Sequence, residues 1–262
     1  WIDLFFFPCF QPIELSKPFL IIILASILAS NKNSNLYLKY LLSIVIISTI
    51  SLFLIMQPDI GQTLLVVFSW GVLIFTSGIN IFFLLVFAIF LSILLTFLII
   101  YVPRFDYIQG RIFSFFNRDT GAHNFQSDKA IDSIVSGGFF GKGIGEGTLK
   151  NRVPEAHTDY IISVISEEFG VIAIMLILLL FLIFIYRVLK KVNYEKNEKA
   201  KLVLIGCVSL ILMQVTIHVR VNTRFFPTTG MTLPFLSYGG SSIVSISILS
   251  GIILNLTKRK ID

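Results

Sequence analysis

Hydrophobic residues occur in long, uninterrupted runs that short polar stretches separate. A helix needs about 20 mostly apolar residues to cross the hydrocarbon core of a bilayer, whereas membrane β-strands alternate apolar and polar positions. Because the runs are continuous, they predict helices. We place seven predicted membrane spans at residues 17–30, 36–56, 61–77, 80–102, 161–188, 202–218 and 242–256. The first span is short, which leaves room for an earlier helix start.

The composition supports a membrane protein. Hydrophobic residues make up 55% of the 262 residues and charged residues only 14%, against about 25% charged in an average soluble domain. This balance excludes a soluble enzyme, a disordered chain and a disulfide scaffold. The sequence therefore predicts an all-α polytopic membrane protein that forms a single domain over residues 1–262.

The basic residues predict the orientation in the membrane. The net charge is +6, and the positive residues flank predicted spans rather than forming a nucleic-acid surface, so we expect no nucleic-acid partner. Lys32 and Lys39 lie in the first loop, six basic residues lie between residues 187 and 201, and Lys258, Arg259 and Lys260 lie near the end of the chain. The loop after Met56 has none. The excess of Lys and Arg in cytoplasmic loops then predicts a cytoplasmic C-terminus.

The same orientation places one long polar loop, residues 103–160, on the external side. It carries seven basic and seven acidic residues. Loops of this length are usually functional, so we expect the chemistry of the protein at its external face.

Four glycines, Gly141, Gly143, Gly145 and Gly147, lie within this loop. They resemble a nucleotide-binding loop, but such a loop requires a strand before it and a helix after it. No strand–helix–strand unit is predicted here. We interpret the glycines as positions where a tight chain path requires positive φ.

Two carboxylates precede the fifth predicted span. Glu155 and Asp159 are four residues apart and would share one helix face. A helix N-terminus stabilises carboxylates, so a capping role is one interpretation. Asp159 also lies at the membrane boundary, where partial desolvation would raise its pKa and suit a general base. His157 is either a hydrogen-bonded loop residue or a functional residue that acts as a metal ligand or a base, and these alternatives stay open.

Other polar residues lie near predicted helix ends. Glu167 and Glu168 are either functional residues within a span or interfacial residues before it. Residues 11–17 and 57–61 are typical of helix starts, with Asp59 as a cap.

Arg220 and Arg224 precede a segment, 233–242, whose Pro and Gly content predicts a broken or re-entrant helix. The two arginines would bind a phosphate group or extend toward lipid headgroups.

Four motifs occur together and in order. They are residues 11–17 (Q-P-I-E-L-S-K), 57–61 (Q-P-D-I-G), 154–159 (P-E-A-H-T-D) and 234–242 (P-F-L-S-Y-G-G-S-S). Over essentially its whole length the chain resembles the SEDS family (shape, elongation, division, sporulation). Residues 145–150 and 229–234 resemble the FtsW branch more than the RodA branch. The family has ten transmembrane helices, so the resemblance implies about three further spans before residue 1.

The resemblance implies a peptidoglycan glycosyltransferase that polymerises lipid II at the external face of the bacterial inner membrane, for septal synthesis in division. Asp159 occupies the position of the family's proposed catalytic residue. The implied reaction needs a base at the acceptor hydroxyl and cations at the departing pyrophosphate. The expected substrate-binding residues are Lys150, Arg152, Glu155, His157, Arg220, Arg224, Ser237, Gly239 and Gly240. A divalent cation, Mg²⁺ or Mn²⁺, would share this work, although no ligand cluster is evident.

The implied partners are a class B penicillin-binding protein and other division proteins. Two other functions stay open at this point: a flippase that moves lipid II across the bilayer, and a scaffold for the penicillin-binding protein. Formation of polymer by purified protein would distinguish the glycosyltransferase from both the flippase and the scaffold.

Overall fold

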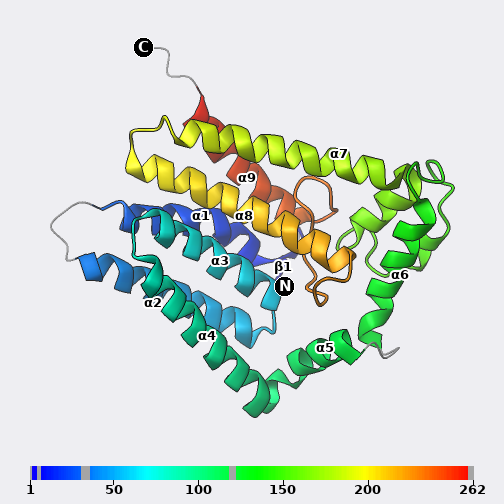
Figure 1. Cartoon of the computed structure of the whole chain (residues 1–262), viewed down its shortest axis with the longest axis horizontal. Helices are drawn as coiled ribbons and strands as arrows, with labels where there is room; N and C mark the ends of the chain where they lie inside the picture. The colour runs from blue at the N-terminus through cyan, green and yellow to red at the C-terminus, as the bar shows by residue number, and fades with distance from the viewer. Residues whose placement is uncertain (1, 5–6, 31–35, 118–121, 259–262) are drawn as a thin grey trace. The chain divides into compact units, whose positions relative to one another are not determined.

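The computed structural model describes residues 2–4, 7–30, 36–117 and 122–258 (Figure 1). Each of the seven predicted ranges lies largely within a helix. These helices are α1 (Pro12–Leu28), α2 (Leu36–Met56), α3 (Ile60–Thr76), α4 (Ile81–Tyr101), α7 (Ile161–Val192), α8 (Glu198–Asn222) and α9 (Gly240–Thr257). The helix of the first range begins at Pro12, a residue type that suits the first helical turn.

Among the described residues, four helices are long and apolar enough to cross a membrane, namely α2, α7, α8 and α9. Helix α3 is apolar but shorter. The predicted all-α polytopic membrane fold is confirmed, and the number of seven spans stays a prediction. Lys32, Arg259 and Lys260, which contributed to the predicted orientation, lie outside the described residues.

Two features differ from the predicted pattern. Two short strands, β1 (Ile2–Leu4) and β2 (Phe7–Phe10), pair in antiparallel orientation, which the hydrophobic pattern did not predict. The long polar loop also contains secondary structure. Its elements are η1 (Pro103–Phe105), α5 (Asp106–Asn117), α6 (Ala122–Gly137) and η2 (Leu149–Arg152).

The chain divides into two compact units, each described by itself. The first comprises residues 1–88, 183–213 and 239–262. In it α1 contacts α2, α3 and α9, and β2 contacts α9. Close packing in this unit depends on a small residue, since a Cβ at Gly206 would lie 2.5 Å from Cγ2 of Ile21 and 3.2 Å from Cδ2 of Leu73. Small residues allow helices of membrane proteins to approach closely.

The second unit comprises residues 89–182 and 214–238. Helix α5 contacts η1 and α6, and α6 contacts η2. The core of this unit includes Ile108, Ala130, Val153 and Tyr160, which are all buried. The unit therefore contains the whole range predicted as the external loop, residues 103–160, together with the start of α7, and it carries the motif that ends at Asp159.

Candidate functional site

A tight turn positions Asp159 directly before α7. Glu155 adopts a left-handed conformation with φ of 53°, which costs a non-glycine residue about 1–3 kcal/mol unless its surroundings enforce it. The carbonyl of Glu155 accepts hydrogen bonds from the N–H groups of Thr158 (3.2 Å), Asp159 (3.0 Å) and Tyr160 (3.3 Å). The turn thus fixes the backbone of Asp159 at the start of the helix.

The segment after α8 holds this turn from a second side. The hydroxyl of Ser237 donates to the carbonyl of Thr158 at 2.6 Å and accepts from the N–H of Leu233 at 2.8 Å. The N–H of Tyr238 donates to the carbonyl of His157 at 2.9 Å. Two of the four sequence motifs are therefore joined in one structure. Ser237 was predicted to bind substrate. In the structure its hydroxyl holds two backbone groups together, and we call this arrangement, with the bond from Tyr238 to His157, the clamp.

Asp159 lies in a partly buried environment. The side-chain amide of Asn222 donates to the Asp159 carbonyl at 3.0 Å, and a Cβ at Gly230 would lie 3.5 Å from Asp159 Oδ2. Burial, and then the charge of Glu155, raise the pKa of Asp159 to about 6, against the opposing effect of Arg111. Within the described residues its carboxylate makes no helix-capping hydrogen bond. This environment suits a carboxylate that exchanges a proton near neutral pH.

Arg111 is a member of this site that the sequence did not indicate. It lies on α5, and its Nη1 donates to the carbonyl of Thr228 at 2.8 Å. Its charge acts on Asp159 and favours the carboxylate form. Arg111 is one of seven basic residues in the predicted loop, and no motif in the sequence singles it out. Only the packing of α5 distinguishes Arg111 from the other six.

The predicted cations have different surroundings. Lys150 forms an ion pair with Glu168, and Arg224 forms one with Asp128. Arg152 and Arg220 are exposed, and no carboxylate of the described residues pairs with them. Arg152 and Arg220 are thus the predicted cations with charge available for an anionic ligand.

Glu167 and Glu168 organise the glycine-containing loop. Glu167 is fully buried, and its carboxylate accepts the N–H groups of Leu149 (2.9 Å) and Lys150 (2.6 Å). Glu168 accepts the N–H of Gly145 at 3.2 Å. These bonds give both glutamates a structural role in holding the loop.

The glycine prediction is confirmed in part. Gly141, Gly143 and Gly145 have φ of 78°, 109° and 82°. The prediction is wrong for Gly147, whose φ is not positive. Its lack of a side chain serves packing instead, because a Cβ there would lie 2.8 Å from Cδ of Glu167.

The remaining predicted residues are less directly connected to Asp159. His157 is exposed and contributes its backbone carbonyl to the clamp described above. Gly239 is the N-cap of α9, and Gly240 is its first residue. Both glycines belong to the first unit, so their predicted role at the substrate stays a prediction.

The described residues contain no cluster of side chains that would coordinate a divalent cation. In the part of the chain that the structure describes, no group of three or more His, Cys, Asp or Glu side chains is placed to hold a metal ion. A protein-held Mg²⁺ or Mn²⁺ site normally uses several oxygen ligands. The described residues therefore do not provide such a set of ligands.

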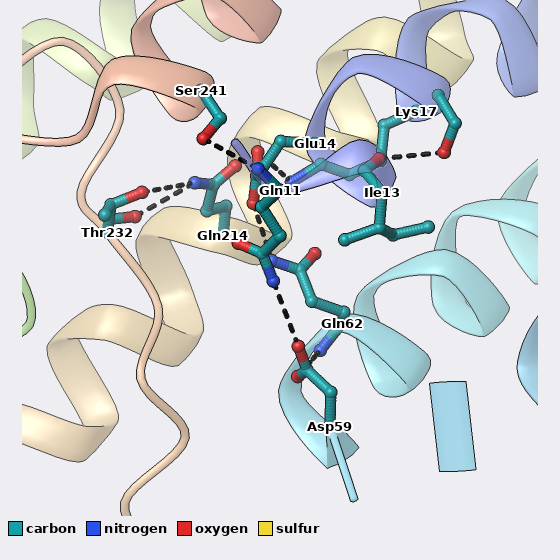
Figure 2. Close-up of polar contacts among 10 residues, drawn as sticks. Gln11, Ile13, Glu14, Lys17, Asp59, Gln62, Gln214, Thr232 and Ser241 are labelled. Carbon is teal, nitrogen blue, oxygen red and sulfur yellow. Dashed lines mark hydrogen bonds and ion pairs between the residues drawn. The ribbon is translucent and has the colours of Figure 1, made fainter. Parts of the chain in front are cut away.

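The first unit contains a separate polar cluster, formed by the motifs at residues 11–17 and 57–61 (Figure 2). Both motifs begin helices as predicted, and the Asp59 carboxylate accepts the N–H of Gln62 at 3.0 Å as a cap. Buried Glu14 pairs with buried Lys17 at 2.6 Å and accepts the side-chain amide of Gln62, also at 2.6 Å. Gln11 donates to Asp59 at 3.3 Å. The cluster compensates charges that would be costly in an apolar interior.

Comparison with known proteins identifies relatives over nearly the whole chain. The probable peptidoglycan glycosyltransferase FtsW of Caulobacter vibrioides is 31% identical over 257 residues, which are 95% of this chain and 63% of that protein. The protein of the same name from Enterococcus hirae is 31% identical over 265 residues, covering 96% of this chain and 66% of that protein. The chain thus spans slightly less than two thirds of the length of these relatives.

Two solved structures share the fold. A chain from a structure described as "Structural coordination of polymerization and crosslinking by a peptidoglycan synthase complex" aligns with a TM-score of 0.77 and 26% identity, over 98% of this chain and 73% of that chain. The rod shape determining protein RodA of Thermus thermophilus aligns with a TM-score of 0.63 and 26% identity, over 94% and 64% of the two chains. The profile of a family described as "Cell cycle protein" (FTSW_RODA_SPOVE) matches residues 1–261. The chain therefore belongs to the FtsW/RodA/SpoVE family of membrane-embedded cell cycle proteins, as its four motifs indicated.

Proposed function

We propose that the full-length protein is a peptidoglycan glycosyltransferase that polymerises lipid II at the external face of the bacterial inner membrane, for septal wall synthesis in division. The names of the curated relatives support this activity. The observation that carries it within this chain is the environment of Asp159, a partly buried carboxylate whose pKa is raised to about 6 at the start of an apolar helix.

In the proposed reaction the hydroxyl of an acceptor sugar attacks the anomeric carbon of the donor. The bond from that carbon to the lipid-linked pyrophosphate breaks, with inversion of configuration. Asp159 accepts the proton of the hydroxyl as general base. The turn at Glu155 and the clamp from Ser237 support this role by holding the Asp159 backbone in place.

The departing pyrophosphate carries negative charge and needs cations near it. Arg152 and Arg220 are the best candidates in the described chain, since they are exposed and form no ion pair with a described carboxylate. Lys150 and Arg224 are secondary candidates because each already pairs with an acidic residue.

We further propose a class B penicillin-binding protein as partner, with other division proteins. Support comes from the similarity to a chain of a structure described as a peptidoglycan synthase complex that coordinates polymerization and crosslinking.

The test is incubation of purified full-length protein with labelled lipid II, followed by gel analysis of glycan. We expect polymer from the unsubstituted protein and a loss of roughly 10²–10⁴ in rate for Asp159→Asn. Asp132→Asn, at an exposed carboxylate of α6, is the matched control and should retain the parental rate. Movement of the headgroup across vesicles without polymer would indicate a flippase, and partner binding without either activity would indicate a scaffold.

The orientation is tested by labelling with an impermeant thiol reagent. Asp132→Cys and Asn197→Cys are suitable positions because both residues are exposed, whereas Ser127 is buried. We expect Asp132→Cys to label in intact spheroplasts and Asn197→Cys to label only after lysis. The reverse pattern would place the C-terminus outside.

A further inference from the structure

Helix α7 is interrupted at Gly170, where φ is 80° and ψ is 173°. A break in a transmembrane helix is tolerated only where other groups satisfy the freed backbone. Here the N–H of Val171 donates to the carbonyl of Gly138 at 3.0 Å, and the N–H of Ile172 donates to the carbonyl of Phe139 at 3.4 Å. The loop after α6 therefore replaces hydrogen bonds that the helix lacks at its break.

The exchange also runs in the opposite direction. The N–H of Lys142 donates to the carbonyl of Glu167 at 2.9 Å, and the N–H of Gly143 donates to the carbonyl of Glu168 at 3.0 Å. The contact leaves no room for a side chain, because a Cβ at Gly141 would lie 2.2 Å from the carbonyl oxygen of Glu168. Residues 138–143 are thus fixed against α7 at the level of residues 167–172.

That level corresponds to a membrane surface. Between Glu168 and Arg187 the helix contains no charged residue. Residues 169–186 would rise about 27 Å at the α-helical rise per residue, which is close to the roughly 30 Å of the hydrocarbon core. The charged residues at either end therefore mark the two surfaces, and the loop lies at the one where α7 begins.

Large apolar side chains project from the loop at this level. Phe139 is 73% exposed, Phe140 84% and Ile144 78%; we call these three residues the apolar tip. Phe169 and Ile172, on the adjoining part of α7, are also exposed. Neighbouring exposed apolar residues on a soluble surface are unfavourable and mark an interaction site.

We propose that the apolar tip inserts into the lipid leaflet at the N-terminal end of the apolar part of α7, at the boundary of headgroups and acyl chains. The occupant is lipid because the tip continues the exposed apolar surface of α7, which includes Met175 and Leu176. Lys142, which lies between Phe140 and Ile144 in the chain, is exposed and pairs with Glu167 at 3.7 Å. Insertion does not depend on the proposed enzymatic activity.

The experiment places a tryptophan in the tip of the full-length protein, in vesicles of phosphatidylcholine and phosphatidylglycerol. The emission that Phe140→Trp adds to the unsubstituted protein should be blue-shifted and quenched by brominated lipids, more by shallow than by deep bromine atoms. Asp132→Trp, at an exposed charged position of α6, is the matched control. Its added emission should be quenched by aqueous iodide and not by brominated lipid.

Equal access of iodide to both substituted positions, without quenching of Phe140→Trp by brominated lipid, would overturn the proposal. A blue shift that appears only when a protein partner is added would also overturn it, since the tip would then bind protein. Phe140 is almost fully exposed, so its substitution should leave the fold intact, and Phe139→Trp provides a second reporter on the same loop.

Discussion

Ser237 and Thr158 are 79 residues apart in the chain, yet the Ser237 hydroxyl donates to the Thr158 carbonyl at 2.6 Å. The same hydroxyl accepts the N–H of Leu233. One side chain therefore closes the turn from Leu233 to Ser237 and also fixes Thr158, the residue before Asp159. The position of the candidate base thus depends on a segment that lies far from it in the sequence.

Substitution Ser237→Ala should leave two backbone groups, the Thr158 carbonyl and the Leu233 N–H, without this partner. We expect a loss of about 1–3 kcal/mol in the free energy of unfolding, measured as a lower unfolding midpoint in detergent. The control is Ser247→Ala, whose exposed hydroxyl bonds only within α9 and which should change stability by less than about 0.5 kcal/mol. Equal effects of the two substitutions would contradict the clamp.

The raised pKa of Asp159 predicts a pH dependence. A general base acts in its deprotonated form, so glycan synthesis by the full-length protein should fall as pH drops below about 6. Stability should change in the opposite direction, because the folded state binds this proton more readily than the unfolded chain. The contribution of Asp159 to stability is therefore present at low pH and lost as pH rises through about 6.

Two neighbours of Asp159 provide a test with opposite signs. Glu155→Gln removes a charge that raises the pKa of Asp159, and should move the acidic limb of the rate profile to lower pH. Arg111→Gln removes a charge that lowers this pKa, and should move the limb to higher pH. Shifts in the same direction, or none, would exclude Asp159 as the titrating base.

Hydropathy alone predicted the helices well. Continuous apolar runs gave ranges that match α2, α3 and α4 within a few residues, because length and composition decide membrane insertion. The helices inside the polar loop were missed. In α5 the apolar residues Ile108, Ile112 and Phe115 recur at helical spacing, but they pack on one face only, and the run is too short and polar to signal a span.

The site was predictable only where a motif carried it. Asp159 was predicted as the candidate base because its charge, its position and the family resemblance agree. Arg111 was missed because its proximity arises from the bond to Thr228, 117 residues away. The role of Glu167 could not be predicted from neighbouring residues either, because the two N–H groups that bond to its carboxylate lie 17 and 18 residues earlier in the chain.

The surroundings of the arginines predict an order of effects on activity. Arg220→Ala should reduce kcat/KM for lipid II by roughly 10- to 150-fold, the equivalent of losing a charge-assisted contact. Arg224→Ala should have a smaller effect, because Asp128 already pairs with Arg224. Asp128→Asn releases Arg224 and should not reduce activity. A larger loss for Arg224→Ala than for Arg220→Ala would reverse the assignment.

Gly170 offers a test of the helix break. A Cβ there would lie 2.1 Å from the Phe139 carbonyl oxygen, and the backbone has positive φ. Gly170→Ala should therefore lower the yield of monodisperse protein and its unfolding midpoint. In Gly251→Ala the new Cβ meets no atom within 4 Å, and alanine should favour the helix by about 0.5–1 kcal/mol. A tolerated Gly170→Ala would show that the break is not required.

The ion pair of Glu14 and Lys17 predicts that stability falls strongly when only one of the two charges is removed. Both side chains are buried, so Lys17→Met alone leaves an uncompensated carboxylate and should cost about 3–5 kcal/mol. The double substitution Glu14→Gln with Lys17→Met removes both charges and should recover most of that loss, measured as the unfolding midpoint in detergent. Lys129 and Asp132 form an exposed pair with the same spacing on α6, and Lys129→Met should cost less than about 1 kcal/mol. Single and double substitutions of equal effect at residues 14 and 17 would mean that the two charges do not stabilise each other.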